Sequence, residues 1–243
     1  MNFIFYDLET TGRNSTWDQI IQVAAILVDK NFNEIERFED RCRLRSGLVP
    51  EPGALLVNKT SIEMLNNVNL SHYELIKKIQ DKFKKWSPAT FIGYNTISFD
   101  EEFLRKTFFK SLLEPYTTQF NGNKRADVLG ITRTSKYYYP ECLRVGMNEK
   151  GNQVFKLDNL TELNNITHNA HDAMGDVEAT IEITKILQNK ANIIWNSALN
   201  NSNKIEVDNF LINNNLVCMD EYFFGKFNTH VVTYLCKNHF NYP

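Results

Sequence analysis

Two apolar runs near the start of the chain constrain its folding more than any other feature. Residues 20–29 (IIQVAAILVD) are almost continuously aliphatic, and residues 3–7 (FIFYD) form a shorter run of the same kind. Runs of this length that end at polar residues are typical of buried β-strands. Residues 34–45 (EIERFEDRCRLR) alternate between polar and apolar side chains, which predicts a third strand with one exposed face. The first 45 residues therefore favour an antiparallel three-stranded meander.

Helices are predicted after these strands. Thr60 with Glu63, and Ser71 with Glu74, have the spacing of a capping box at a helix start. Three further elements are expected: a buried strand over residues 90–95, a helix over 100–113 and a long helix over 172–188. This order of strands and helices predicts an α/β fold with a mixed sheet.

Composition excludes several classes of protein. The chain has 243 residues, of which 42% are hydrophobic, enough for a sizeable core. It begins without a basic segment ahead of an apolar run, and no uncharged apolar run approaches about 18 residues, so neither a secretory signal nor a membrane span is expected. The four cysteines are far apart in sequence and form no C-x-x-C pair, which argues against a zinc site or a disulfide framework. A cytoplasmic location is predicted.

The net charge of −2 means that any contact with nucleic acid must be local. Residues 77–86 are rich in lysine, but their apolar side chains recur at helical spacing, so the lysines are expected on a solvated helix face. Residues 133–139 (RTSKYYY) combine two cations with three tyrosines. Such a segment can stack on bases and pair with phosphates, and it can equally pack into the fold.

Asp7 and Glu9 stand two residues apart at the end of the first strand. In an extended chain both side chains project to the same face. Two carboxylates held side by side repel each other unless they are exposed or share a cation, and hard oxygen ligands of this kind suit Mg²⁺ or Mn²⁺. The pair alone leaves both interpretations open.

Later acids and a histidine could join this pair. Asp100 follows the strand over 90–95 as an N-cap or first-turn residue of the next helix. Asn169 is the expected N-cap of the last helix, which places His171 in the first turn and Asp176 beyond it. A histidine there is either an ordinary hydrogen-bonded residue, or a general base or metal ligand if carboxylates converge on it.

Taken together, these motifs resemble the DEDDh exonucleases of the ribonuclease H-like superfamily, and among them the bacterial exonuclease I subgroup. Four stretches carry the subgroup resemblance: PEPGALLVNKTSIEML, FIGYNTISFDEEFLRKTFF, RADVL and FKLDNLTELNNITHNAHDAMGDVEATI. The resemblance covers roughly residues 2–190. It implies a ribonuclease H-like mixed five-stranded sheet flanked by helices.

The resemblance also implies a set of site residues. The catalytic residues would be Asp7, Glu9, Asp100, His171 and Asp176. The four acids would hold two Mg²⁺ ions, with Mn²⁺ as a substitute, and His171 would be the general base. The residues that seat the terminal nucleotide would be Leu8, Thr10, Thr11 and Phe99.

The implied activity is 3′–5′ hydrolysis of single-stranded DNA to 5′-mononucleotides by a two-metal-ion mechanism, in DNA repair and recombination. The implied partners are the 3′ end of single-stranded DNA and single-strand DNA-binding protein, with no membrane. Three alternatives stay open: an exoribonuclease of the oligoribonuclease or ribonuclease T type, a proofreading module bound to a polymerase, and a non-catalytic single-strand binding module.

The same resemblance suggests how the chain is divided. We expect an exonuclease domain over residues 1–195, an Asn-rich linker over 196–208 and the beginning of an SH3-like domain over 209–243. That last domain would be incomplete, as an SH3-like β segment whose remainder is missing. Processive digestion is the property that such a truncation would affect.

Overall fold

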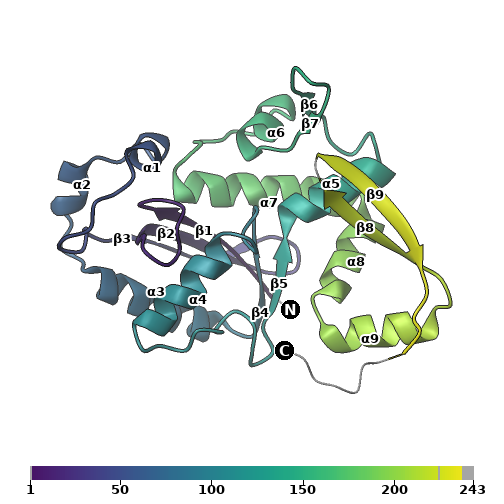
Figure 1. Ribbon diagram of the computed structural model, residues 1–243, viewed down its shortest axis with the longest axis horizontal. Coiled ribbons are helices and arrows are strands. Elements are labelled where there is room, and N and C mark those ends of the chain that lie inside the picture. Colours follow the sequence, from purple (N-terminus) through teal and green to yellow (C-terminus); the bar gives the residue numbers. More distant parts are fainter. Residues whose placement is uncertain (1, 224, 237–243) are drawn as a thin grey trace.

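The computed structural model describes residues 2–223 and 225–236 of the chain. Its centre is a five-stranded sheet in the order β3-β2-β1-β4-β5 (Figure 1). The strands are β1 (Asn2–Thr10), β2 (Ile20–Val28), β3 (Glu34–Arg41), β4 (Ala89–Gly93) and β5 (Lys124–Asp127). The first three are antiparallel neighbours, as the sequence predicts, whereas β4 runs parallel to β1 and β5 parallel to β4. The predicted α/β class with a mixed five-stranded sheet is confirmed.

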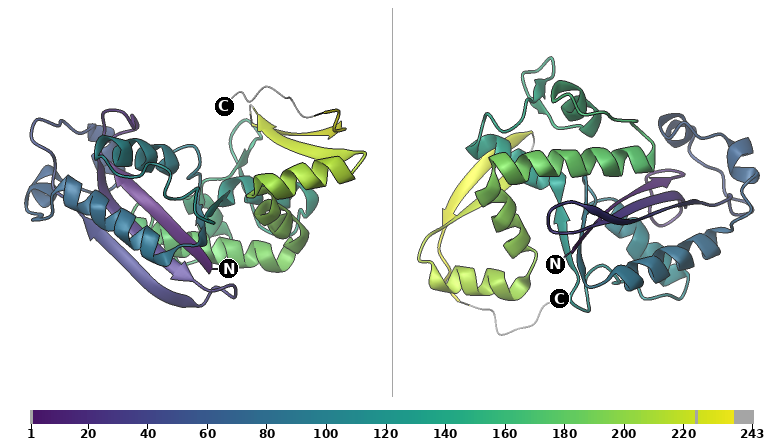
Figure 2. Two further views of the ribbon diagram at one scale, coloured as in Figure 1. Left: turned by 90° about the horizontal axis from the view of Figure 1, so that it is seen from below. Right: turned by 180° about the vertical axis from the view of Figure 1, so that it is seen from behind.

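Helices cover both faces of this sheet (Figures 1 and 2). One face packs on α3 (His72–Trp86) and α4 (Asp100–Lys110). The other packs on α5 (Val128–Tyr138), α7 (Ala173–Lys190) and α8 (Asn192–Asn201). The remaining described elements are α1 (Pro52–Val57), α2 (Ile62–Asn66), α6 (Leu157–Leu163), α9 (Lys204–Asn213), the hairpin of β6 (Gly146–Met147) with β7 (Gln153–Val154), and the hairpin of β8 (Val217–Phe223) with β9 (Lys226–Val232).

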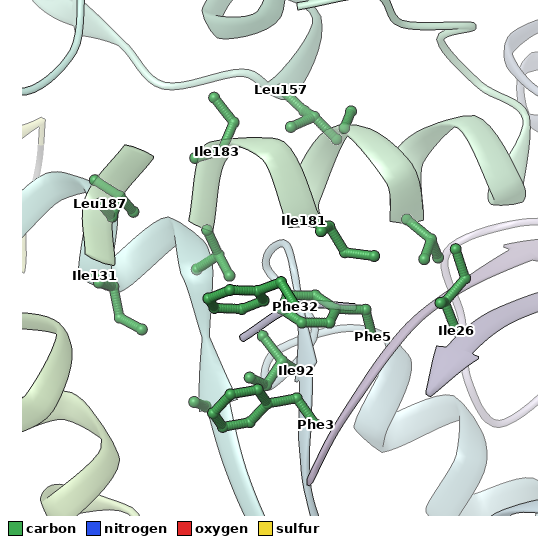
Figure 3. Close-up of a cluster of buried hydrophobic side chains, with 14 of the residues drawn as sticks. Phe3, Phe5, Ile26, Phe32, Ile92, Ile131, Leu157, Ile181, Ile183 and Leu187 are labelled. Carbon is green, nitrogen blue, oxygen red and sulfur yellow. The ribbon is translucent and has the colours of Figure 1, made fainter. Parts of the chain in front are cut away.

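The side chains of β1 alternate between two hydrophobic cores. Phe3 and Phe5 lie in the core beneath α7, where Ile181 joins them (Figure 3). The intervening side chains lie in the core beneath α3 and α4, namely those of Ile4, Tyr6 and Leu8. Because successive side chains of a strand point to opposite faces, the same alternation directs Asp7 and Glu9 toward the α7 side.

Helix starts agree with the sequence in part. Ser71 and Glu74 form the predicted capping box at the start of α3. The prediction for the preceding helix is wrong by one residue: Ser61, not Thr60, is the N-cap of α2, and its hydroxyl accepts a hydrogen bond from the backbone N–H of Met64 at 3.0 Å.

The start of the long helix also differs from the prediction. Asp172, not Asn169, is the N-cap of α7. The reason is a close approach between the helix and the chain before it. A side chain at Gly175 would place a Cβ only 2.4 Å from the carbonyl oxygen of Asn169, so Asn169 lies beside the first turn rather than ahead of it.

The aromatic and basic segment at 133–139 packs a hairpin onto α5. Tyr137 stacks on Phe227 of β9 with ring centroids 4.2 Å apart. The guanidinium of Arg133 lies 4.1 Å from the ring centroid of Tyr222 on β8. Of the two interpretations left open by the sequence, these contacts support packing.

The end of the chain contains more helix than the sequence indicates. Residues 196–208, expected as a linker, lie mostly in α8 and α9. Within 209–243 the described part consists of the end of α9 and the β8–β9 hairpin, while residues 224 and 237–243 lie outside the described residues. The SH3-like assignment and the domain boundaries stay predictions. Among the described helices, none is long and apolar enough to cross a membrane.

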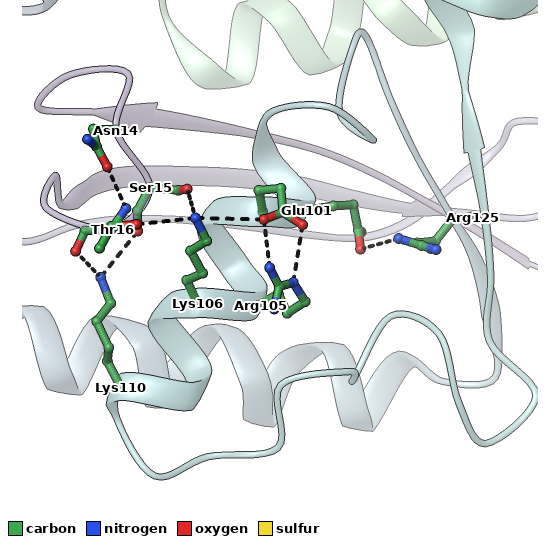
Figure 4. Close-up of polar contacts among 9 residues, drawn as sticks. Asn14, Ser15, Thr16, Glu101, Arg105, Lys106, Lys110 and Arg125 are labelled. Carbon is green, nitrogen blue, oxygen red and sulfur yellow. Dashed lines mark hydrogen bonds and ion pairs between the residues drawn. The ribbon is translucent and has the colours of Figure 1, made fainter. Parts of the chain in front are cut away.

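One buried carboxylate joins α4 to the sheet. Glu101 is 4% exposed, and its two oxygens accept hydrogen bonds from the Tyr6 hydroxyl at 2.6 Å and the Thr118 hydroxyl at 2.7 Å. The Arg125 guanidinium of β5 completes the group at 3.1 Å (Figure 4). A buried charge of this kind stabilises the fold only while its partners remain.

Substitution of this buried acid is expected to destabilise the protein strongly. Glu101→Ala should lower the free energy of unfolding by about 3–5 kcal/mol, because it leaves three donors without their acceptor. The matched control is Glu102→Ala, which removes a half-exposed ion pair with Arg105 and should cost at most about 1 kcal/mol. Urea denaturation measures both, and equal losses would contradict this account.

Candidate active site

Three carboxylates converge where β1 meets the start of α7. Asp7 and Glu9 come from the end of the strand, and Asp176 from the first turn of the helix. One oxygen from each of the three lies within 4.8 Å of the others. The alternation of β1 and the packing of α7 on that face together produce this arrangement.

The environment of the pair on β1 opposes ionisation. Burial raises the pKa of Asp7 well above its usual range, and the charges of Asp100 and Glu9 raise it further. Burial also raises the pKa of Glu9 to about 7, helped by the charge of Asp176. Since the protein holds these acids together at a cost, a cation between them would be stabilising.

Asp100 approaches the site from the opposite layer. It is the first residue of α4, is 3% exposed, and burial raises its pKa well above the usual range. Its Oδ1 atom is buried and has no hydrogen-bond partner among the residues that the structure describes. Asp100 lies outside the group of three converging oxygens, but its charge is the largest electrostatic influence on Asp7.

Asp127 fixes the loop that leads from β4 to Asp100. Its carboxylate accepts hydrogen bonds from the backbone N–H groups of Asn95 at 2.9 Å and Ile97 at 3.1 Å, and it caps α5 through that of Leu129 at 3.0 Å. Asp127 is thus the N-cap of α5, and the neighbouring Arg125 pairs with Glu101.

The imidazole that contacts Asp176 is that of His168, whereas His171 contacts the same acid through its backbone. His171 has a left-handed backbone (φ 63°), and its backbone N–H donates to Asp176 Oδ1 at 3.3 Å. The side chain on that oxygen is His168, whose Nε2 lies 2.6 Å away. His168 is nearly buried, and its Nδ1 lies 3.0 Å from the hydroxyl of Thr161.

Sequence reasoning missed His168. The only signal was the spacing H-N-A-H, which places two histidines three residues apart before the helix. Such a pair does not reveal which member faces the acids, because that depends on where the helix begins.

The residues expected to seat a terminal nucleotide are largely internal. Leu8 is 3% exposed and belongs to the core beneath α3 and α4. The hydroxyl of Thr10 donates to the carbonyl of Gly12 at 2.7 Å, and that of Thr11 to Asp18 at 3.1 Å. The side chain of Leu8 is thus in the core and those of Thr10 and Thr11 are engaged in the turn after β1, so a substrate would reach this segment through backbone groups.

Phe99 is the N-cap residue of α4 and stands directly before Asp100. It is half-buried, and its ring centroid lies 5.0 Å from that of Phe103. A hollow of about 530 Å³ lies elsewhere, between β2–β3 and the outer side of α7, and none of the four acids lines it.

Comparison with known proteins agrees with this geometry. Residues 4–184 match the model of a protein family described as exonuclease. The chain belongs to this exonuclease family. The matched range contains all four acids and both histidines of the site.

Several named exonucleases are similar to this chain over most of its length. Exodeoxyribonuclease I of Buchnera aphidicola subsp. Schizaphis graminum is 39% identical over 196 residues, which are 78% of this chain and 40% of that protein. Exonuclease I of Escherichia coli in complex with a dT13 oligonucleotide has a TM-score of 0.81 at 30% identity, covering 86% of this chain and 45% of that one. A structure of an ExoI/SSB-Ct complex has a TM-score of 0.83 at 28% identity, covering 92% and 49%. The chain thus spans less than half the length of these relatives.

The raised pKa values of the buried acids predict how the stability of the protein depends on pH when no metal is present. The folded protein binds the Glu9 proton more tightly than the unfolded chain, so stability should fall as pH rises from about 4.5 to about 7. For Glu9 this pKa shift corresponds to a loss of stability on the order of 3 kcal/mol. The raised pKa values of Asp7 and Asp100 lower stability in the same direction as pH rises. Glu9→Gln should flatten this slope.

Urea denaturation in EDTA at several pH values measures the effect. Glu63→Gln, an exposed acid on α2, is the matched control and should keep the wild-type slope. A metal-free protein that is as stable at pH 7 as at pH 4.5 would contradict the electrostatic account.

Proposed function

We propose that this chain is a metal-dependent 3′–5′ exonuclease that hydrolyses single-stranded DNA to 5′-mononucleotides. The observation that carries the proposal is the convergence of Asp7, Glu9 and Asp176, with buried Asp100 close enough to act on Asp7. The similarity to exonuclease I, over more than three quarters of the chain, supports this reading of the acids.

The donor set fits hard divalent cations. All four side chains offer only oxygen, three of them meet within 4.8 Å, and a buried oxygen of Asp100 has no partner in the described part of the chain. Asp7, Glu9, Asp100 and Asp176 would hold two Mg²⁺ ions or Mn²⁺ in their place. When bound, such ions lower the pKa of a water and stabilise the charge on the departing 3′ oxygen.

The two histidines would have separate tasks. His171, at the position of the family's general base, accepts the proton of the attacking water. His168 holds Asp176, because its imidazole lies between that carboxylate and the hydroxyl of Thr161. A hydrogen-bonded ligand of this kind keeps one orientation, and loss of such a partner generally weakens metal binding.

The substrate would enter with its 3′ end at the acids. The backbone around Leu8, Thr10 and Thr11 and the ring of Phe99 would seat the terminal nucleotide. Single-stranded DNA is the proposed substrate because it occupies the related E. coli structure, and single-strand DNA-binding protein is a proposed partner because SSB-Ct is bound in another. A cytoplasmic location stays a prediction.

The activity is tested by digestion of a 5′-labelled single-stranded DNA oligonucleotide with Mg²⁺. We expect a ladder that shortens from the 3′ end and disappears in EDTA. Asp7→Asn should lower the rate by about 10³-fold or more, because it removes a ligand that supports several kcal/mol of transition-state stabilisation. Asp81→Asn, an exposed acid on α3, is the control and should keep the wild-type rate.

Matched RNA and duplex DNA substrates separate the alternatives. Faster shortening of RNA than of DNA would assign the chain to the ribonuclease type. Binding without any metal-dependent cleavage would contradict the enzymatic proposal.

The roles of the histidines are tested by two matched variants. His171→Gln should lower kcat by about 10²–10⁴-fold while the Mg²⁺ concentration for half-maximal rate is kept, because only proton transfer is lost. His168→Gln should raise that Mg²⁺ concentration about 10–100-fold and leave kcat at saturating Mg²⁺ within a few-fold. Loss of kcat in His168→Gln with full activity in His171→Gln would reverse the assignment.

A further inference from the structure

One large aromatic side chain is left in solvent close to the acids in sequence. Trp17 is 75% exposed, whereas the other two tryptophans, Trp86 and Trp195, are 5% and 1% exposed. It stands eight residues after Glu9, in the loop that connects β1 to β2. An exposed indole of this size is a candidate contact surface.

Three cations hold the loop in place from two sides. Lys106 donates to the hydroxyls of Ser15 and Thr16 at 2.9 and 3.2 Å, and Lys110 donates to the carbonyls of the same residues at 3.2 and 3.1 Å (Figure 4). Arg45 donates to the carbonyl of Trp17 itself at 3.2 Å. The exposed indole therefore stands on an anchored loop.

These cations lie close enough to repel one another. Burial lowers the pKa of Lys110, and the charges of Arg45 and Lys106 lower it further, against the opposing effect of Asp18. Burial lowers the pKa of His72 to about 4, again with repulsion from Arg45 and Lys110. In a protein of net charge −2 these cations gather at one place, where Asp18 and Glu102, the latter 3.9 Å from Lys106, balance them only in part.

The position of the loop relates it to the candidate active site. Lys106 and Lys110 lie six and ten residues beyond Asp100 on α4, which corresponds to about 9 and 15 Å along the helix axis. Successive phosphates of a DNA strand are separated by a few ångströms, about 3.4 Å of axis in a duplex strand. A strand whose 3′ end is at the acids can therefore reach the loop within a few nucleotides.

We propose that Trp17, Arg45, Lys106 and Lys110 form a binding site for single-stranded DNA a few nucleotides before its 3′ end, with the indole stacked on a base and the cations paired with phosphates. We call it the Trp17 patch. It rests on the proposed function, since it takes the same strand that the acids would cut. Aromatic stacking combined with cationic backbone contacts is the general chemistry of single-strand binding.

The patch is tested first by tryptophan fluorescence in EDTA, where no metal-dependent cleavage competes. Trp86 and Trp195 are buried, so the tryptophan fluorescence that responds to a ligand at the surface should come mainly from Trp17. Addition of a thymidine oligonucleotide should quench this emission with the same Kd that fluorescence anisotropy of a labelled oligonucleotide reports. If anisotropy shows that the oligonucleotide binds while the emission of Trp17 does not change, the proposal is overturned.

Variants separate stacking from charge. Trp17→Ala should weaken Kd about 5-fold or more, the low end for a lost base–aromatic stack, and Trp17→Phe should recover part of the loss. Lys110→Gln should reduce the slope of log Kd against log salt by about 0.7, the value for one phosphate contact on a single strand. Phe210→Ala, a half-exposed ring on distant α9, is the matched control and should bind as wild type (Figure 1).

The outcomes also distinguish this proposal from the proposed function. A wild-type protein that digests DNA, with Trp17→Ala binding as tightly as wild type, would overturn the patch and leave the exonuclease intact. If DNA quenches the emission of Trp17 but the protein never cleaves DNA with Mg²⁺, the proposed patch stands and the proposed exonuclease activity is overturned.

Discussion

The site depends on carboxylates that the fold forces together. A strand cannot place residues two apart on different faces, so Asp7 and Glu9 share the face that α7 covers, and the start of α7 adds Asp176. Burial and mutual repulsion raise the pKa values of Asp7 and Glu9, which makes this arrangement unfavourable without a counterion. Divalent cations bound between the carboxylates would offset this repulsion and so stabilise the folded protein.

The rest of the fold keeps these acids from moving apart. Above the sheet, α7 is fixed by the core around Phe5 and Ile181, and below it α4 is fixed by Glu101 and its three donors. Asp127 adds a third restraint by binding the loop that ends at Asp100. None of these groups needs to touch a substrate, yet each determines where a carboxylate lies. The site is therefore a meeting point of two separately packed layers.

The sequence predicts those parts of the structure that depend on local patterns. The apolar run over 20–29 becomes β2, and the Ser71–Glu74 spacing becomes a capping box, because strand burial and helix capping are decided within a few residues. The two-residue spacing of Asp7 and Glu9 likewise predicts their common face, whereas their assignment to a site comes from the resemblance to the exonucleases. What the sequence cannot provide is the contact between segments distant in the chain.

Two features illustrate that limit. The N-cap of α7 is Asp172 rather than Asn169, whose carbonyl instead packs against Gly175. The imidazole on Asp176 belongs to His168, which the sequence did not single out. Likewise, the tyrosines at 137–139 offer no local sign that a hairpin from residues 217–232 will cover part of them. In both cases the deciding interaction is tertiary, while the propensity of the segment is compatible with either outcome.

The most direct test of the central claim is to locate the cation itself. Crystals grown with Mn²⁺ allow its position to be determined from anomalous scattering. The account predicts a strong anomalous peak between Asp7, Glu9 and Asp176, and a second ion within reach of Asp100. Crystals saturated with Mn²⁺ that show no peak among these carboxylates, or the acids turned away from one another, would contradict it.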